Sequence, residues 1–178
     1  MRTTFCLPPK GPVDFTWIDI REPDQDELGF LSEEFQIPRN LVLDCLIPDH
    51  LPKFEDGPDM DFLLVRKHHW PVGPEDDTIQ ELSTKVAIFY NDRNLITIHR
   101  TDQPFLRDIY KEVVEPYGDR QVTEVITRIL IEVVRSYEKP LETLADQIDL
   151  MEDEIFLRHN TRSDLQQDLI FQIGRAHV

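Results

Sequence analysis

The sequence has no long apolar run and few glycines and cysteines. Of its 178 residues, six are glycine and two are cysteine, Cys6 and Cys45. Two cysteines give no disulfide framework in a chain of this size, which favours a reducing compartment. Six glycines leave little room for a nucleotide cradle, and neither a phosphate-binding loop nor a G-x-S-x-G nucleophile elbow is present. We therefore expect that the chain is not an enzyme.

No apolar stretch approaches the ~20 residues that a membrane-spanning helix needs. The longest candidate, residues 122–134, is interrupted by Glu124, Arg128 and Glu132. The N-terminus carries one arginine and lacks the apolar core of a signal peptide. The sequence therefore predicts a chain that does not itself conduct ions through a membrane.

Basic residues are scarce relative to acidic ones. Lysine and arginine number 19 against 35 aspartates and glutamates, which gives a formal net charge of −16. Nucleic acids and anionic membrane surfaces both require clustered basic residues, so neither is expected as a partner. The charge favours divalent cations as partners, or it reflects a solvated acidic surface.

The first two thirds of the sequence alternate between strand and helix signals. Alternating, β-rich runs predict strands at residues 1–6, 15–20, 61–70, 85–90 and 95–99, the last two joined as a hairpin. Helices are predicted after Pro23, where Glu22 or Asp24 is the N-cap, after Pro38, and over residues 103–117. Residues 71–78 are expected to form a polar loop.

The last third is dominated by helix. Apolar residues recur every three or four positions over residues 121–157, which predicts a long amphipathic helix. Pro140 lies inside it, so we expect a kink or break near Tyr137. A turn at residues 158–161 and a further helix from Ser163 should follow. Strands first and long helices last indicate an α+β fold, divided into domains at 1–118 and 119–178.

A stripe of acidic residues marks this long helix. Between Glu138 and Glu154 there are seven acidic residues and one basic residue, Lys139. Like charges on one helix face cost a few tenths of a kcal/mol each, and hydrated Mg²⁺ relieves that cost by binding one or two carboxylates. The alternative is a solvated face opposite an apolar stripe. The residues that share the face are Glu138, Glu142, Asp146, Asp149 and Asp153.

Other polar residues give weaker signals. Asp44 precedes Cys45, which is expected to be a small buried hydrophobe, and by its position alone Asp44 is a surface residue or helix cap. Six histidines suggest zinc, but His68 and His69 point to opposite faces of a strand and no pair has tetrahedral-site spacing. Asp19 is expected to orient backbone at a strand end.

From these residues alone, two other classes of function remain open. One is a soluble acidic scaffold whose long helices bind a partner helix. The other is a metal-dependent hydrolase that uses Asp19, Asp44 and residues 68–69 as ligands.

Several motifs follow one another in a fixed order. They are Trp17-Ile18-Asp19-Ile20, an amphipathic helix, Ile37-Pro38, Leu41-Val42-Leu43-Asp44-Cys45-Leu46, Pro52-Lys53, the strand at 95–99 and the acidic helix at 148–155. This order resembles the cytoplasmic domain of the CorA family of magnesium channels. The resemblance implies a small mixed β-sheet flanked by helices, followed by long acidic antiparallel helices.

The resemblance also implies metal sites. In the family, the acid at the position of Asp44 faces the stalk of a neighbouring subunit, and a cation bridges the two. The family commonly has two adjacent acids there, whereas this chain has Leu43-Asp44. The acidic helix corresponds to the family's willow helices. The implied ligands of a weak, regulatory Mg²⁺ are therefore Asp44, Glu142, Asp146, Asp149 and Asp153.

The function implied is regulation of an ion channel. The chain is similar to a domain that senses intracellular divalent cations and gates the pore from the cytoplasmic face of the membrane. The family's stalk and two transmembrane helices, with their Gly-Met-Asn motif, would lie beyond Val178, and the full-length protein would be a homopentamer. A zinc-transporting relative is the alternative within the family, because selectivity belongs to the pore.

Overall fold

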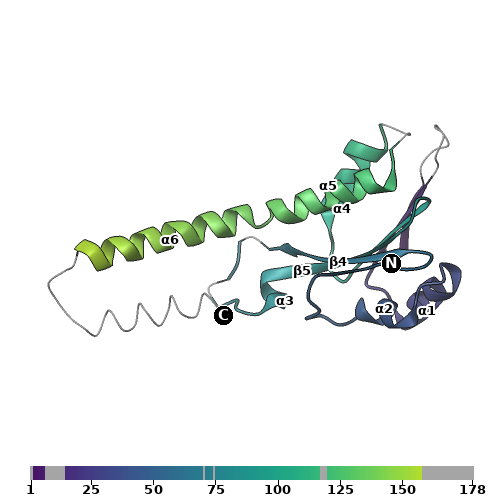
Figure 1. Cartoon of the computed structure of the whole chain (residues 1–178), viewed down its shortest axis with the longest axis horizontal. Helices are drawn as coiled ribbons and strands as arrows, with labels where there is room; N and C mark the ends of the chain where they lie inside the picture. The colour runs from purple at the N-terminus through teal and green to yellow at the C-terminus, as the bar shows by residue number, and fades with distance from the viewer. Residues whose placement is uncertain (1, 7–14, 70, 74, 117–119, 158–178) are drawn as a thin grey trace. The chain divides into compact units, whose positions relative to one another are not determined.

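The computed structural model describes residues 2–6, 15–69, 71–73, 75–116 and 120–157. The chain divides into two compact units, residues 1–137 and residues 138–178. The first holds the sheet and the helices α1 to α5, and the second holds the helix α6 (Glu138–Leu157) (Figure 1). The domain boundary inferred from the sequence, at residue 118, stays a prediction.

The first unit is built on a mixed sheet. The described strands are β1 (Arg2–Cys6), β2 (Thr16–Arg21), β3 (Lys53–Glu55), β4 (Asp61–His68), β5 (Ser83–Tyr90) and β6 (Asn94–His99). They form one six-stranded sheet in the order β1-β2-β6-β5-β4-β3. β2 and β6 are parallel, and all other neighbours are antiparallel. The predicted mixed sheet is confirmed, whereas the edge strand β3 was not predicted.

Two helices on one side of the sheet begin at the positions that the sequence indicated. Asp24 caps α1 (Gln25–Glu34): its Oδ1 accepts a hydrogen bond from the Glu27 amide at 2.7 Å, and the Glu27 carboxylate accepts one from the Asp24 amide at 3.3 Å. This reciprocal capping box satisfies two amides that the helix leaves unpaired. α2 (Arg39–Asp44) follows Pro38. Asp24, and not Glu22, is therefore the cap.

The remaining helices of the first unit depart in part from prediction. α3 (Ile79–Leu82) follows directly on the predicted loop, held by a capping box between Thr78 and Glu81. The predicted helix at 103–117 is α4 (Pro104–Ile109) continued by a π-helical turn, η1 (Tyr110–Val114). α5 (Val122–Arg135) begins the predicted long helix.

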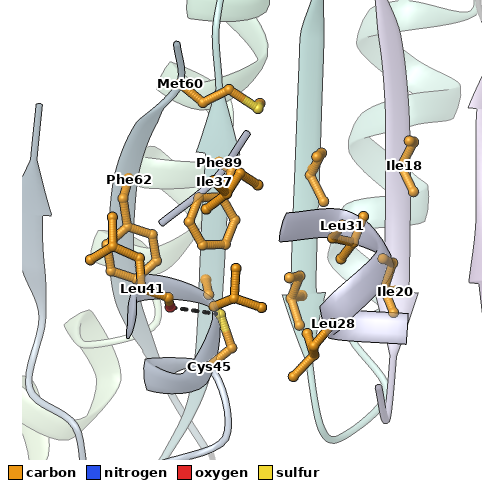
Figure 2. Packing of buried hydrophobic residues seen from close by; sticks show 14 of the residues in the cluster. Ile18, Ile20, Leu28, Leu31, Ile37, Leu41, Cys45, Met60, Phe62 and Phe89 are labelled. Atoms are coloured by element: carbon orange, nitrogen blue, oxygen red, sulfur yellow. Dashed lines mark hydrogen bonds between the residues drawn. The ribbon is translucent and has the colours of Figure 1, made fainter. Parts of the chain in front are cut away.

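One face of the sheet packs against α1 and α2 (Figure 1). Figure 2 shows Ile18 and Ile20 of β2 lying toward Leu28 and Leu31 of α1. The stacked rings of Phe62 and Phe89, with centroids 4.7 Å apart, fill the neighbouring part of this core. Burial of such side chains supplies the main driving force for folding.

Cys45 belongs to the same core (Figure 2). Its thiol donates a hydrogen bond to the Leu41 carbonyl at 3.6 Å. Burial raises the pKa of the Cys45 thiol to about 12, so the reactive thiolate is not formed at neutral pH. The expectation that Cys45 is a small buried hydrophobe is confirmed.

The other face packs against α4 and α5. Side chains alternate along a strand, so Trp17 faces Leu106 and Ile129 on this side while Ile18 faces the opposite core. The end of α5 is tied to β4, because the His68 amide donates to Ser136 Oγ at 2.9 Å and the Tyr137 hydroxyl donates to the Arg66 carbonyl at 2.9 Å. The sheet therefore lies between two helical layers.

The long helix breaks at the predicted place. α5 ends at Arg135 and α6 begins at Glu138. Pro140 has no amide to donate to the carbonyl of Ser136, four residues earlier, and its ring crowds that carbonyl. No strand interrupts the described stretch from 122 to 155. The predicted turn at 158–161 and the helix from Ser163 lie outside the described residues.

Candidate metal site at Asp44 and along the acidic helix

Asp44 is the last residue of α2, and its carboxylate already contacts a cation. Its Oδ2 lies 2.6 Å from Lys53 Nζ and 3.7 Å from His50 Nε2. The Asp44 side chain is 19 % exposed, so it is not the solvated surface carboxylate that its position alone indicated. Lys53 is the first residue of β3 and follows Pro52 directly.

A second carboxylate shares the same ammonium. Lys53 and Glu55 are two residues apart on β3 and therefore project on the same side. Glu55 Oε1 lies 2.6 Å from Lys53 Nζ, and we call this group the Asp44–Lys53–Glu55 cluster. The ammonium also lies 5.2 Å from the centre of the Phe62 ring, within the range of a cation–π contact.

These contacts favour the protonated, charged form of Lys53. Burial opposes protonation, but the hydrogen bonds to Asp44 and Glu55 outweigh it and raise the pKa of Lys53 above its ordinary value. Lys53 is therefore charged at neutral pH. Carboxylate oxygens suit Mg²⁺, but any cation that bound directly between Asp44 and Glu55 would have to displace this ammonium.

A second lysine binds backbone carbonyls at and after the C-terminal end of α2. Lys85 Nζ, from β5, donates to the Asp44 carbonyl at 2.8 Å and to the Ile47 carbonyl. Carbonyls at a helix C-terminus have no partner within the helix and carry partial negative charge, which a lysine neutralises. The backbone oxygen of Asp44 is thus engaged as well as its carboxylate.

The acids of α6 have different surroundings. Glu142, Asp146, Asp149 and Asp153 are all exposed, and Glu142 Oε2 lies 3.3 Å from Lys139 Nζ. They belong to the second unit, whereas Asp44 belongs to the first. Among the described residues no group of three or more His, Cys, Asp or Glu side chains is arranged to hold a metal ion. Metal binding at these positions stays a prediction.

Asp19 anchors a buried polar network on the α5 side of the sheet. Its Oδ1 accepts a hydrogen bond from Thr97 Oγ1 at 2.6 Å and lies 3.0 Å from His99 Nε2. Trp17 Nε1 in turn donates to Thr97 Oγ1 at 3.0 Å. The expectation that Asp19 orients backbone is therefore wrong: it orients side chains on the neighbouring strand β6.

The ligand set of the hydrolase hypothesis is not assembled among the described residues. Asp19 is bound by Thr97 and His99, and Asp44 is bound by Lys53. His68 Nδ1 is buried without a hydrogen-bond partner, and its ring packs edge-on against Tyr137. These groups form no metal-ligating cluster in the part of the chain that the structure describes.

Sequence reasoning missed the residues that surround Asp44. Lys53 entered the prediction only through the Pro52-Lys53 motif, and neither Glu55 nor His50 was assigned a role. The alternation Lys-x-Glu after Pro52 was the available signal, since it places a cation and an acid on one side of a short strand.

No helix within the described residues is both long enough and apolar enough to cross a bilayer. Four large apolar side chains of α6 are nevertheless exposed: Leu141, Leu144, Ile148 and Leu150. Three of them, Leu141, Leu144 and Ile148, follow the three- and four-residue spacing of the apolar stripe.

The fold is a mixed sheet between two helical layers, and comparison with known families identifies the family to which it belongs. The family described as CorA-like Mg²⁺ transporter protein matches residues 13–176. The chain belongs to this family of divalent-cation transporters.

A curated relative is the cobalt/magnesium transport protein CorA of Methanocaldococcus jannaschii, 27 % identical over 143 residues. The match covers 78 % of this chain and 43 % of the relative, so the chain spans less than half of that protein's length.

Solved structures share the fold at low identity. The full-length CmaX protein matches with a TM-score of 0.61 at 15 % identity, over 89 % of this chain and 48 % of that one. The CorA magnesium transporter from M. jannaschii gives 0.57 at 20 % identity, over 91 % and 50 %. The ZntB cytoplasmic domain from Vibrio parahaemolyticus gives 0.59 at 18 % identity, over 76 % and 54 %.

Proposed function

We propose that this chain is the regulatory domain of a divalent metal-ion channel, held at the cytoplasmic face of the membrane, and that it senses intracellular Mg²⁺ to close the pore. The observation that carries the proposal is the family match over residues 13–176, which includes the whole described sheet from β2 onward. The net charge of −16 supports a role in which cations are the ligand.

The mechanism rests on repulsion between acidic copies. In a homopentamer, domains that each carry a charge of −16 repel one another, although salt screens exposed charges over about 8 Å at physiological ionic strength. Mg²⁺ between subunits reduces the repulsion and favours the closed arrangement. A cation shifts such an equilibrium only if it binds the closed state more tightly than the open one.

Lys53 gives Asp44 a specific part in this mechanism. Within one chain the ammonium already contacts both Asp44 and Glu55 and balances one of their two negative charges, so a lone domain has less need of a metal ion there. A carboxylate from a neighbouring subunit's stalk would add negative charge that Lys53 does not balance, and a divalent cation would then bind. Asp44 thus senses Mg²⁺ only in the assembled channel.

The acidic helix would contribute a weaker, diffuse effect. Glu142, Asp146, Asp149 and Asp153 are exposed and suit hydrated Mg²⁺ that keeps most of its water. The exposed apolar side chains of α6 offer a surface on which the stalk of the channel would pack.

A flux assay tests the proposal. The full-length channel is placed in liposomes, and ion flux is measured at low and high Mg²⁺ on the side that carries this domain. Asp44→Ala should weaken inhibition by high Mg²⁺ and leave ion selectivity unchanged. Asp49→Ala is the matched control, because Asp49 is an exposed acid in the next loop with no ion pair in the described structure.

The outcomes separate the candidate sites and metals. Inhibition that is unchanged in the Asp44→Ala channel removes Asp44 from the regulatory site and leaves the α6 acids as the candidates. Inhibition by micromolar Zn²⁺ in place of millimolar Mg²⁺ would instead assign the channel to a zinc-handling branch.

A further inference from the structure

A cavity of about 520 Å³ lies at the carboxyl ends of the parallel strands β2 and β6. Its lining includes residues 22–23 after β2, residues 100–101 after β6, residues 83–85 at the start of β5, and Arg66 of β4. Ligands of sheet proteins commonly bind at the carboxyl ends of parallel strands. The volume lies within the range of small-molecule sites, about 300 to 1,000 Å³.

Arg66 places a buried positive charge beside this cavity. The residue is 4 % exposed. Its five N–H donors all bind uncharged acceptors, which are Ser83 Oγ and the carbonyls of Pro48, His50, Ile79 and Ser83. The hydrogen bonds are therefore satisfied, whereas no carboxylate in the described structure lies within ion-pair distance and Asp49 acts on the guanidinium only from further away. Burying an ion without a counter-charge is costly.

Lys85 adds a second buried charge in the same lining. It is 9 % exposed, and two of its three N–H donors go to the Asp44 and Ile47 carbonyls. The third donor has no acceptor among the described residues.

The mouth of the cavity supplies further donors. Arg100 is exposed and forms no ion pair in the described structure. Thr101 Oγ1 accepts a hydrogen bond from Gln103 Nε2 at 3.2 Å, which leaves its own hydroxyl proton free to donate. The one acid in the lining, Glu22, has a side chain 65 % exposed and lies 4.0 Å from Arg21.

Three cations therefore converge on one cavity in a chain whose net charge is −16. We propose that this cavity binds the phosphate group of a small phosphorylated molecule, with Arg100, Thr101 and the free N–H of Lys85 as direct donors and Arg66 as a buried counter-charge. Charge-assisted hydrogen bonds of this kind suit phosphate oxygens. The cavity is larger than a bare phosphate requires, which favours a phosphate ester such as a nucleotide, held by side chains because the sequence has no glycine-rich phosphate loop. The proposal does not rest on the metal-sensing function, although Lys85 also binds the Asp44 carbonyl.

Calorimetric titration of the chain tests the proposal, in EDTA and at fixed ionic strength, with ADP, inorganic phosphate and adenosine as probes. ADP should bind saturably, phosphate more weakly, and adenosine not at all. Arg100→Gln should weaken ADP binding about tenfold, the loss expected for one charge-assisted hydrogen bond. Arg100 is exposed and bonds no described group, so this change leaves the fold intact.

Arg93→Gln is the matched control, since it removes the same charge from an exposed site at the opposite end of β6. It should leave ADP binding unchanged. Amide NMR shifts on ADP addition should gather at Glu22 and at residues 83–85 and 100–101. Absence of saturable binding, or equal weakening by Arg93→Gln, overturns the proposal. Binding to anionic-lipid vesicles but not to ADP overturns it in favour of a lipid headgroup.

Discussion

Replacing Lys53 by methionine tests whether the lysine ammonium occupies the position that a metal ion would take between Asp44 and Glu55. Its nitrogen lies 2.6 Å from one oxygen of Asp44 and 2.6 Å from one oxygen of Glu55. Calcium–oxygen distances in proteins are about 2.3 to 2.6 Å, and magnesium binds closer, at about 2.0 to 2.1 Å. The two carboxylates are therefore already arranged around a cation-sized position, with His50 beside them.

The expected loss of stability follows from these contacts. Lys53→Met removes two charge-assisted hydrogen bonds and leaves two carboxylates facing each other. The Asp44, Lys53 and Glu55 side chains are 19 %, 24 % and 42 % exposed, so solvent offsets part of the repulsion. We expect the free energy of unfolding to fall by about 1 to 2 kcal/mol, between the values for exposed and buried pairs.

Divalent cations should restore this loss. In the Lys53→Met chain, millimolar Mg²⁺ or Ca²⁺ should raise the melting temperature well beyond the effect of NaCl at matched ionic strength, because a ligand that binds only the folded state stabilises it. The unsubstituted chain should respond equally to both salts. Lys111→Met, which removes an exposed lysine, is the matched control. A Lys53→Met chain that responds no more to Mg²⁺ than to NaCl refutes the reasoning.

Two further predictions concern stability. The raised pKa of Lys53 means that its contribution is fully present below the pKa of an unfolded lysine, about 10.4, and is lost as pH rises through the higher folded value. Urea denaturation above pH 10 should therefore show a loss of stability that Lys53→Met lacks. Asp19→Asn should cost about 1.5 to 3 kcal/mol, because it removes the buried carboxylate that accepts a hydrogen bond from Thr97 and lies 3.0 Å from the His99 ring. A change below about 0.5 kcal/mol in urea denaturation would contradict that role.

Elements with local signals were predictable from the sequence. The hairpin of β5 and β6 and the cap at Asp24 depend on residues within a few positions of each other. The break before α6 depends on Pro140 alone. The missed elements are short. β3 has three residues and α3 has four, which are too few for a hydrophobic periodicity to be recognised in the sequence.

The surroundings of the candidate sites were not predictable, because they depend on contacts distant in sequence. Lys85 reaches the Asp44 carbonyl from 41 residues away, only because β5 lies in the middle of the sheet. Arg66 interrupts an apolar strand and would be assigned to solvent, yet it is buried and binds the carbonyls of Pro48 and of Ile79 in α3. Periodicity gives the face on which a side chain lies, but not the partner that it meets there.

The two groups of candidate metal ligands, Asp44 and the acids of α6, differ in how their negative charge is balanced. Their stability responses to salt should therefore differ. The α6 acids are exposed, so monovalent salt screens them and Mg²⁺ should act there much as ionic strength does. Asp44 is partly buried and paired with Lys53, so screening reaches it less. A response to Mg²⁺ that exceeds the response to matched NaCl therefore points to Asp44 and its neighbours, and Lys53→Met shows whether the lysine suppresses that response in a single chain.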